Sequence, residues 1–157
     1  MKVTKKVALA LFVVFIALQF YRPEMNQAQG NHTASFLTET NPPAKVKLIL
    51  KESCYDCHSN HTEYPWYNNV APVSYWLADH IKDGKKHLNF SDWANYDDKK
   101  KDHKLEEFIE MVEAGEMPLK EYTWTHETAN LTEQQRNDLM SWAEQTRLLY
   151  QLNQQPQ

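Results

Sequence analysis

The chain has 157 residues, of which 41% are hydrophobic, a formal net charge of −4 and only two cysteines. This length fits one small domain plus its two ends. After the first 22 residues the chain carries 13 basic and 21 acidic residues, with no basic stripe. This composition argues against nucleic acid as a partner and is compatible with a soluble surface that meets a basic protein.

The N-terminus has the composition of an export signal. Three lysines precede an apolar run from Val7 to Phe20, which only Gln19 interrupts. No small-x-small cleavage motif follows, so we expect residues 1–22 to stay as an uncleaved signal-anchor in a membrane. The run is shorter than the roughly 20 residues that cross a bilayer comfortably, which leaves cleavage as the alternative. The positive-inside rule then places the rest of the chain in the periplasm.

The remaining sequence divides into three parts. Residues 23–42 are polar and aperiodic, which predicts a flexible tether, and residues 152–157 predict a frayed tail. Residues 43–151 form the predicted domain. They contain only two glycines, Gly84 and Gly115, and no run of alternating apolar residues. This pattern predicts an all-α fold rather than a sheet.

Apolar residues at helical spacing predict about four helices. The first follows Pro42-Pro43, runs through "AKVKLILKES" and delivers the chain into Cys54. The second begins at Pro72, a residue suited to a first helical turn. The apolar faces predicted for these two helices are Val46, Ile49 and Leu50, then Val73, Trp76, Leu77, His80 and Ile81.

The third helix is predicted near residues 100–114, with Gly115 as the glycine that ends it. The fourth begins at Thr132, which forms a capping box with Gln135. The inward-facing residues expected in these two helices are Leu105, Phe108, Ile109 and Val112, then Leu139, Trp142, Ala143, Leu149 and Tyr150.

Both cysteines stand in "CYDCH", a Cys-x-x-Cys-His sequence at the end of the first predicted helix. This is the attachment sequence for c-type haem. Two thiols three residues apart can each add to one vinyl group of the porphyrin, and the next imidazole can ligate the iron. We therefore expect Cys54 and Cys57 to anchor one covalent haem c, with His58 as the proximal iron ligand.

Other uses of two cysteines fit this sequence less well. A structural zinc site needs four ligands, and there is no second cysteine pair. A thioredoxin-like dithiol needs a βαβ context, which this sequence does not predict. A structural disulfide is compatible with an oxidising compartment but gives no reason for His58.

The sixth iron ligand has two candidates in the sequence. Met117 stands in "EAGEMPLKEY", in a loop that Pro118 stiffens. His80 lies in the apolar stripe of the second helix, where it would be a buried structural residue, a propionate partner or the distal ligand. An open or water-bound iron is the third alternative, and we favour Met117.

The segments "CYDCHSNHTEYPWY", "APVSYWLADHIKDG", "LNFSDW" and "GEMPLKEY" occur in this order between residues 44 and 150. In this combination the chain resembles the small haem-binding domain of membrane-anchored bacterial proteins of the Bacteroidetes type. The Met-Pro loop resembles the distal ligand loop of small monohaem cytochromes c. The resemblance implies a cytochrome c-like helical domain with covalent haem, and implies little about its reaction or partner.

These features favour a membrane-tethered electron carrier with an unidentified redox partner protein. His/Met ligation leaves the iron no free site, and the sequence shows no acid–base constellation that requires an enzyme. The alternatives are a haem-based sensor of small ligands and a peroxidase-like enzyme, both of which need an open distal site.

Overall fold

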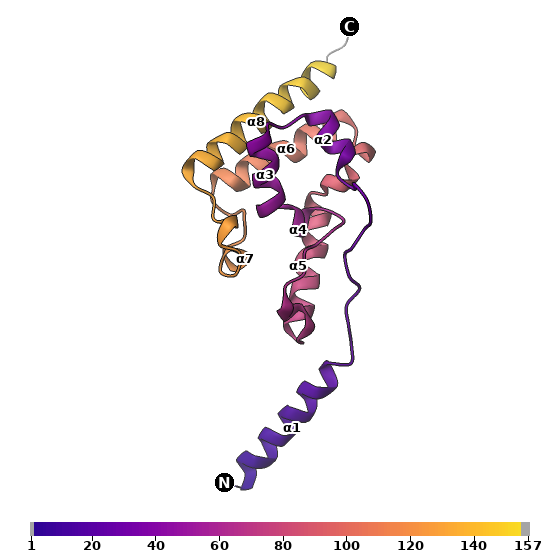
Figure 1. Ribbon diagram of the computed structural model, residues 1–157, viewed down its shortest axis with the longest axis vertical. Coiled ribbons are helices and arrows are strands. Elements are labelled where there is room, and N and C mark those ends of the chain that lie inside the picture. The colour runs from indigo at the N-terminus through magenta and orange to yellow at the C-terminus, as the bar shows by residue number, and fades with distance from the viewer. Residues whose placement is uncertain (1, 155–157) are drawn as a thin grey trace.

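The structure, a computed structural model, describes residues 2–154 and is built of helices and loops (Figure 1). Within those residues the only β-type pairing is one isolated bridge between Gln27 and His61, so the predicted all-α fold is confirmed. The α-helices are α1 (Lys2–Leu18), α2 (Ala34–Thr40), α3 (Ala44–Ser53), α4 (Tyr55–His58), α5 (Val73–His87), α6 (Asp98–Glu113), α7 (Lys120–Thr123) and α8 (Glu133–Asn153). The 3-10 helices are η1 (Trp66–Asn69), η2 (Phe90–Asn95) and η3 (Glu127–Ala129).

The four predicted helices are α3, α5, α6 and α8, and their ends carry the predicted signals. Helix α3 starts directly after Pro43. Gly115, with a φ of 69°, follows α6 in the left-handed region that favours glycine. Thr132 and Gln135 form the complete capping box at the start of α8. The proline, the glycine and the capping box at these helix ends therefore set the boundaries.

The core lies where α3, α6 and α8 meet the α2 and η2 segments. Helices α6 and α8 lie side by side along the domain (Figure 1). The buried apolar cluster comprises Phe36, Val46, Ile49, Leu50, Leu88, Phe90, Trp93, Tyr96, Leu105, Phe108, Val112, Leu139, Trp142, Ala143 and Tyr150. Leu149, predicted to face inward, is exposed, because Thr146 and Tyr150 occupy the inward face of the last turns of α8.

The segment predicted as a flexible tether is largely part of the folded domain. Helix α2 lies within it, and Phe36 is fully buried, with its ring 4.6 Å from that of Phe90 and 5.2 Å from that of Trp93. Further upstream, Ala28 N–H donates to Asn60 at 2.8 Å. The prediction of a flexible tether is therefore wrong for these residues, because one aromatic side chain suffices to dock a polar segment.

Helix α1 stands away from the domain, and its apolar side chains are exposed (Figure 1). Among the described residues, no helix combines the length and the apolar character needed to cross a membrane. At the other end, α8 continues to Asn153, so residues 152 and 153, predicted to be part of a frayed tail, are helical. Residues 155–157 of that tail and residue 1 of the predicted signal-anchor lie outside the described residues.

Candidate functional site

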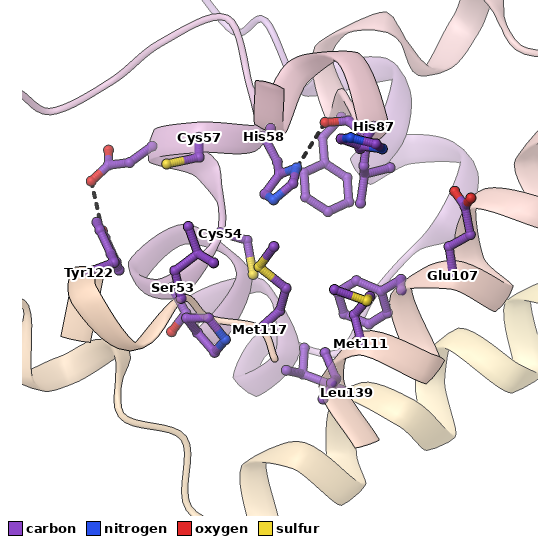
Figure 2. A pocket seen from close by; sticks show the side chains of 18 of the residues that line it. Ser53, Cys54, Cys57, His58, His87, Glu107, Met111, Met117, Tyr122 and Leu139 are labelled. Carbon is purple, nitrogen blue, oxygen red and sulfur yellow. Dashed lines mark hydrogen bonds between the residues drawn. The ribbon is translucent and has the colours of Figure 1, made fainter. Parts of the chain in front are cut away.

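The Cys-x-x-Cys-His sequence forms one tight turn between α3 and the end of α4. Cys54 closes α3, and its carbonyl accepts the N–H of His58 at 2.9 Å. One helical turn therefore separates Cys54 from Cys57, and both line the same pocket as His58 (Figure 2). The structure thus brings the three predicted attachment residues to one site.

The pocket is a cavity of about 580 Å³, within the range of about 300–1,000 Å³ typical of cofactor-sized sites. Side chains from α3, α4, α5, α6, α7 and α8 line it, together with the Met-Pro loop. Its apolar wall includes Leu88, Phe90, Phe108, Val112, Leu119, Leu131 and Leu139. Such a wall suits a large flat apolar group.

His58 is oriented by a backbone carbonyl. Its Nδ1 lies 3.0 Å from the oxygen of Leu88, and because a carbonyl only accepts, Nδ1 carries the proton and donates. The lone pair of Nε2 is then available for a metal. Burial lowers the pKa of His58, and the carbonyls of Leu88 and Gly84 partly oppose this effect. A neutral imidazole with a free Nε2 is the form that ligates iron.

Cys54 and Cys57 are free cysteines. Burial raises the pKa of each thiol to about 12, helped by the neighbouring Cys57 in the case of Cys54 and by Asp56 in the case of Cys57. Both side chains are therefore protonated thiols at neutral pH, which is the form whose S–H can add across a vinyl group.

Two thioethers, not one, lie across the pocket from His58 (Figure 2). Met117 is the residue that the sequence predicts there. Met111, on α6, is the residue that sequence reasoning missed, although it shares a helical face with Phe108 and Val112. The two are connected through the backbone, because the N–H of Met117 donates to the carbonyl of Met111 at 3.1 Å.

His80 also lines the pocket, but not as a buried core residue. It is half-buried, and its Nδ1 lies 2.8 Å from the carbonyl oxygen of Trp76. The ring centroids of His80 and Trp76 are 4.2 Å apart. Within the predicted apolar stripe of α5, Ile81 is buried while Val73 and Trp76 are 38% and 45% exposed. The prediction of a buried stripe is therefore wrong at these positions, because the helix faces the pocket rim and solvent there.

A hydrogen bond ties the Met-Pro side of the pocket to the attachment turn. The hydroxyl of Tyr122, on α7, donates to the carboxylate of Asp56 at 2.8 Å (Figure 2). Burial raises the pKa of Tyr122, and Asp56 raises it further, so the phenol stays protonated. The bond fixes α7, which begins three residues after Met117, relative to the turn that holds both cysteines.

The pocket rim is more acidic than basic. Its acidic side chains are Asp56, Asp83, Glu107 and Glu110, and its basic ones are Lys104, His80 and His87. Lys104 and Glu107 form an ion pair at 2.6 Å, which holds the pKa of Glu107 below its usual range. Lys104 and His87 both line the pocket and carry N–H groups that can donate to carboxylates of a cofactor.

The residues present fit a covalently attached haem. The pocket offers two thiols for attachment to the porphyrin. It also offers a neutral imidazole and facing thioethers, which are ligand types that haem iron accepts. The buried hydroxyl of Ser53, at the pocket wall, also lacks a hydrogen-bond partner within the described residues. Such an unsatisfied polar atom is expected where a cofactor completes the site.

Comparison with known proteins agrees with this chemistry. Neither the curated proteins nor the solved structures include a match to this chain. The family model of the haem-binding domain matches residues 13–145, which is most of the chain and includes every residue of the pocket. The chain therefore belongs to the haem-binding domain family.

Proposed function

We propose that this protein is a c-type cytochrome that carries one covalent haem and transfers electrons. The observation that supports this most is the placement of His58 and Met117 on opposite sides of a pocket that both attachment thiols line. When bound, haem supplies an iron that gains and loses one electron. The chain's own residues would hold it: Cys54 and Cys57 would form thioethers with it, and His58 and Met117 would ligate its iron as the proximal and distal ligands.

His/Met ligation favours electron transfer over ligand binding. A thioether at the sixth position leaves no free site and raises the reduction potential relative to bis-histidine ligation. The apolar wall keeps water from the iron, which reduces the reorganisation that accompanies a change of charge. Lys104 and His87 are the proposed partners of the haem carboxylates.

We also propose that α1 attaches the protein to the bacterial inner membrane, with the domain in the periplasm. Support comes from the lysines before the apolar run and from the exposure of apolar side chains along α1. The redox partner is proposed to be a protein with a basic surface, because the pocket rim and the chain after residue 22 are acidic.

A visible spectrum of the full chain, produced with a cytochrome c maturation system, tests the haem proposal. Haem should stay with the chain through denaturation and acid-acetone extraction, and the ferrous form should be six-coordinate and low-spin. A Cys54→Ala, Cys57→Ala double variant should lose its haem in the same extraction. Haem retained by the double variant would refute the attachment residues.

Carbon monoxide separates the alternative functions. A His/Met-ligated haem binds it poorly. Tight binding by a five-coordinate wild type would instead favour a sensor or a peroxidase-like enzyme, with His80 as a pocket-lining histidine that could act there.

A further inference from the structure

The end of α1 is fixed to the domain and does not hang free. The side chain of Gln19 binds both backbone groups of Ala71, donating to its carbonyl at 3.2 Å and accepting its N–H at 3.0 Å. The hydroxyl of Tyr75 donates to the carbonyl of Leu18. Arg22 donates to the carbonyl of Asn69 at 2.6 Å. These contacts define one orientation of the domain relative to α1.

An exposed apolar surface lies beside this junction. We call it the aromatic corner, and it comprises Phe20, Trp66, Val70, Val73 and Trp76. Phe20 is 86% and Trp66 79% exposed, and residues 65–78 contain no charged side chain. Figure 1 shows that the start of α5 is the end of the domain nearest to α1. The corner thus continues the apolar surface of α1 at the point where the chain enters the domain.

The chemistry of this surface matches the interface of a lipid bilayer. Tryptophan and tyrosine gather at the headgroup level, where their rings are apolar and their polar atoms stay hydrated. Residues 65–78 contain no acidic side chain that anionic headgroups would repel. The long side chain of Arg22 can place its guanidinium at those headgroups.

The length of α1 points to the same partner. Its 17 residues span about 26 Å, less than the hydrocarbon thickness of about 30 Å. A hydrophobic stretch shorter than the bilayer is accommodated by local thinning of the bilayer and by flanking residues at the interface, so the residues after α1 lie close to the headgroups. With Gln19 bound to Ala71, the residues placed there are those of the aromatic corner.

We propose that the aromatic corner rests in the headgroup layer of the membrane that α1 enters, so that the haem domain lies against the bilayer in a fixed orientation. This inference rests on the proposed membrane attachment. It also orients the haem pocket. The ring of Trp76 in the corner lies 4.2 Å from the ring of His80, which lines the pocket, so the His80 side of the pocket is turned toward the lipid.

Site-specific photocrosslinking in the full, haem-loaded chain tests the proposal. Trp66 and, separately, Val73 are replaced by p-benzoyl-phenylalanine, and the protein is illuminated in vesicles of phosphatidylethanolamine and phosphatidylglycerol. Mass spectrometry should show lipid adducts at both positions. Leu152, 63% exposed at the far end of α8, is the matched control and should yield none. Gln19→Ala should lower the adduct yield at position 66 while the chain stays with the vesicles.

The possible failures are distinguishable. Vesicle-bound chain without lipid adducts at both corner positions would refute the aromatic corner alone. Adducts to a second copy of the chain, or to another protein in native membranes, would replace lipid with a protein partner and also refute it. Chain that does not bind vesicles would refute the membrane attachment together with the corner, while the haem spectrum would still report on the cytochrome proposal.

Discussion

Gly84 of α5 lies directly against the backbone of Cys57. A Cβ built on Gly84 would stand 2.6 Å from the carbonyl oxygen of Cys57 and 3.1 Å from its Cβ. Only glycine permits this approach of α5 to the attachment turn. The carbonyl of Leu88, which orients His58, follows one turn later on the same segment. The packing of Gly84 on Cys57 thus sets the position of the His58 imidazole.

Gly84→Ala should therefore destabilise the domain even though alanine favours helices. The gain in helix propensity is about 1 kcal/mol, whereas overpacking against backbone costs about 1–3 kcal/mol. Urea unfolding should show a net loss of stability, and the fraction of chains with covalent haem should fall. Lys82→Ala, on the exposed side of α5, is the control and should change stability little. Equal stability of the two variants would contradict the proposed close packing.

Met117→Ala and Met111→Ala form a matched pair. If Met117 ligates iron, its removal should give a high-spin ferrous form that binds carbon monoxide. Met111→Ala should keep the low-spin spectrum, because the proposal assigns no iron ligation to its thioether. His80→Ala should also leave the spectrum unchanged. If the Met111→Ala variant binds carbon monoxide and the Met117→Ala variant does not, the distal iron ligand is Met111 of α6 and not Met117.

Tyr122→Phe removes the hydrogen bond to Asp56 and should loosen the Met-Pro side of the pocket. A hydrogen bond to a charged group contributes about 1.5–3 kcal/mol, and Tyr122 is only half-buried, so we expect a loss near the lower value. The absorption band of the sulfur–iron bond should disappear at a lower temperature than in the wild type. Tyr67→Phe, which removes an exposed bond to Thr125, is the control. Identical melting of that band in both variants would argue against this positioning role.

Phe36→Ala tests whether residues 34–40 belong to the domain. Truncating a buried phenylalanine costs about 3–5 kcal/mol, and Phe36 is fully buried. Phe12→Ala in α1 makes the same chemical change at a side chain that is 59% exposed, and should leave the unfolding free energy of the domain unchanged. A flexible tether would predict the same small effect for both variants in urea unfolding.

Acid should weaken the contact between the segment before α2 and the loop after α4. The rings of His32 and His61 stack at 5.7 Å, and Nδ1 of His32 lies 2.9 Å from Oγ of Ser91. Burial, and secondarily His61, lower the pKa of His32 below its ordinary value of 6.5.

Because the pKa of His32 is lower in the folded than in the unfolded chain, the unfolded chain binds more protons as the pH falls. The contribution of neutral His32 to the unfolding free energy is therefore complete above pH 6.5 and is lost below it. The unfolding free energy should decrease between pH 7 and pH 5, and a His32→Gln variant should show a weaker decrease. Parallel curves for the two proteins would rule out His32 as the titrating group.

The sequence by itself determined the features that depend on neighbours a few residues apart. The spacing of Cys54, Cys57 and His58 predicts their shared turn, because one helical turn places residues i and i+3 on one side. Gly115 and the Thr132–Gln135 capping box predicted helix ends for the same local reason. The inward faces of α3 and α6 followed from periodicity, since their apolar residues at helical spacing pack into the buried core. These residues are Val46, Ile49 and Leu50, then Leu105, Phe108 and Val112.

The tertiary structure alone decided the features that depend on residues far apart in the chain. Periodicity marks an apolar stripe on α5 but does not show whether that stripe faces the core, a pocket or the surface. It therefore predicted Trp76 and His80 to be buried, whereas Trp76 is exposed and His80 is half-buried. Nor could polar composition reveal that Phe36 docks on Phe90 and Trp93. Met111 becomes a pocket residue only because α6 packs across from α4. Each of these outcomes depends on which helix surfaces meet, and that is determined by packing over the whole chain.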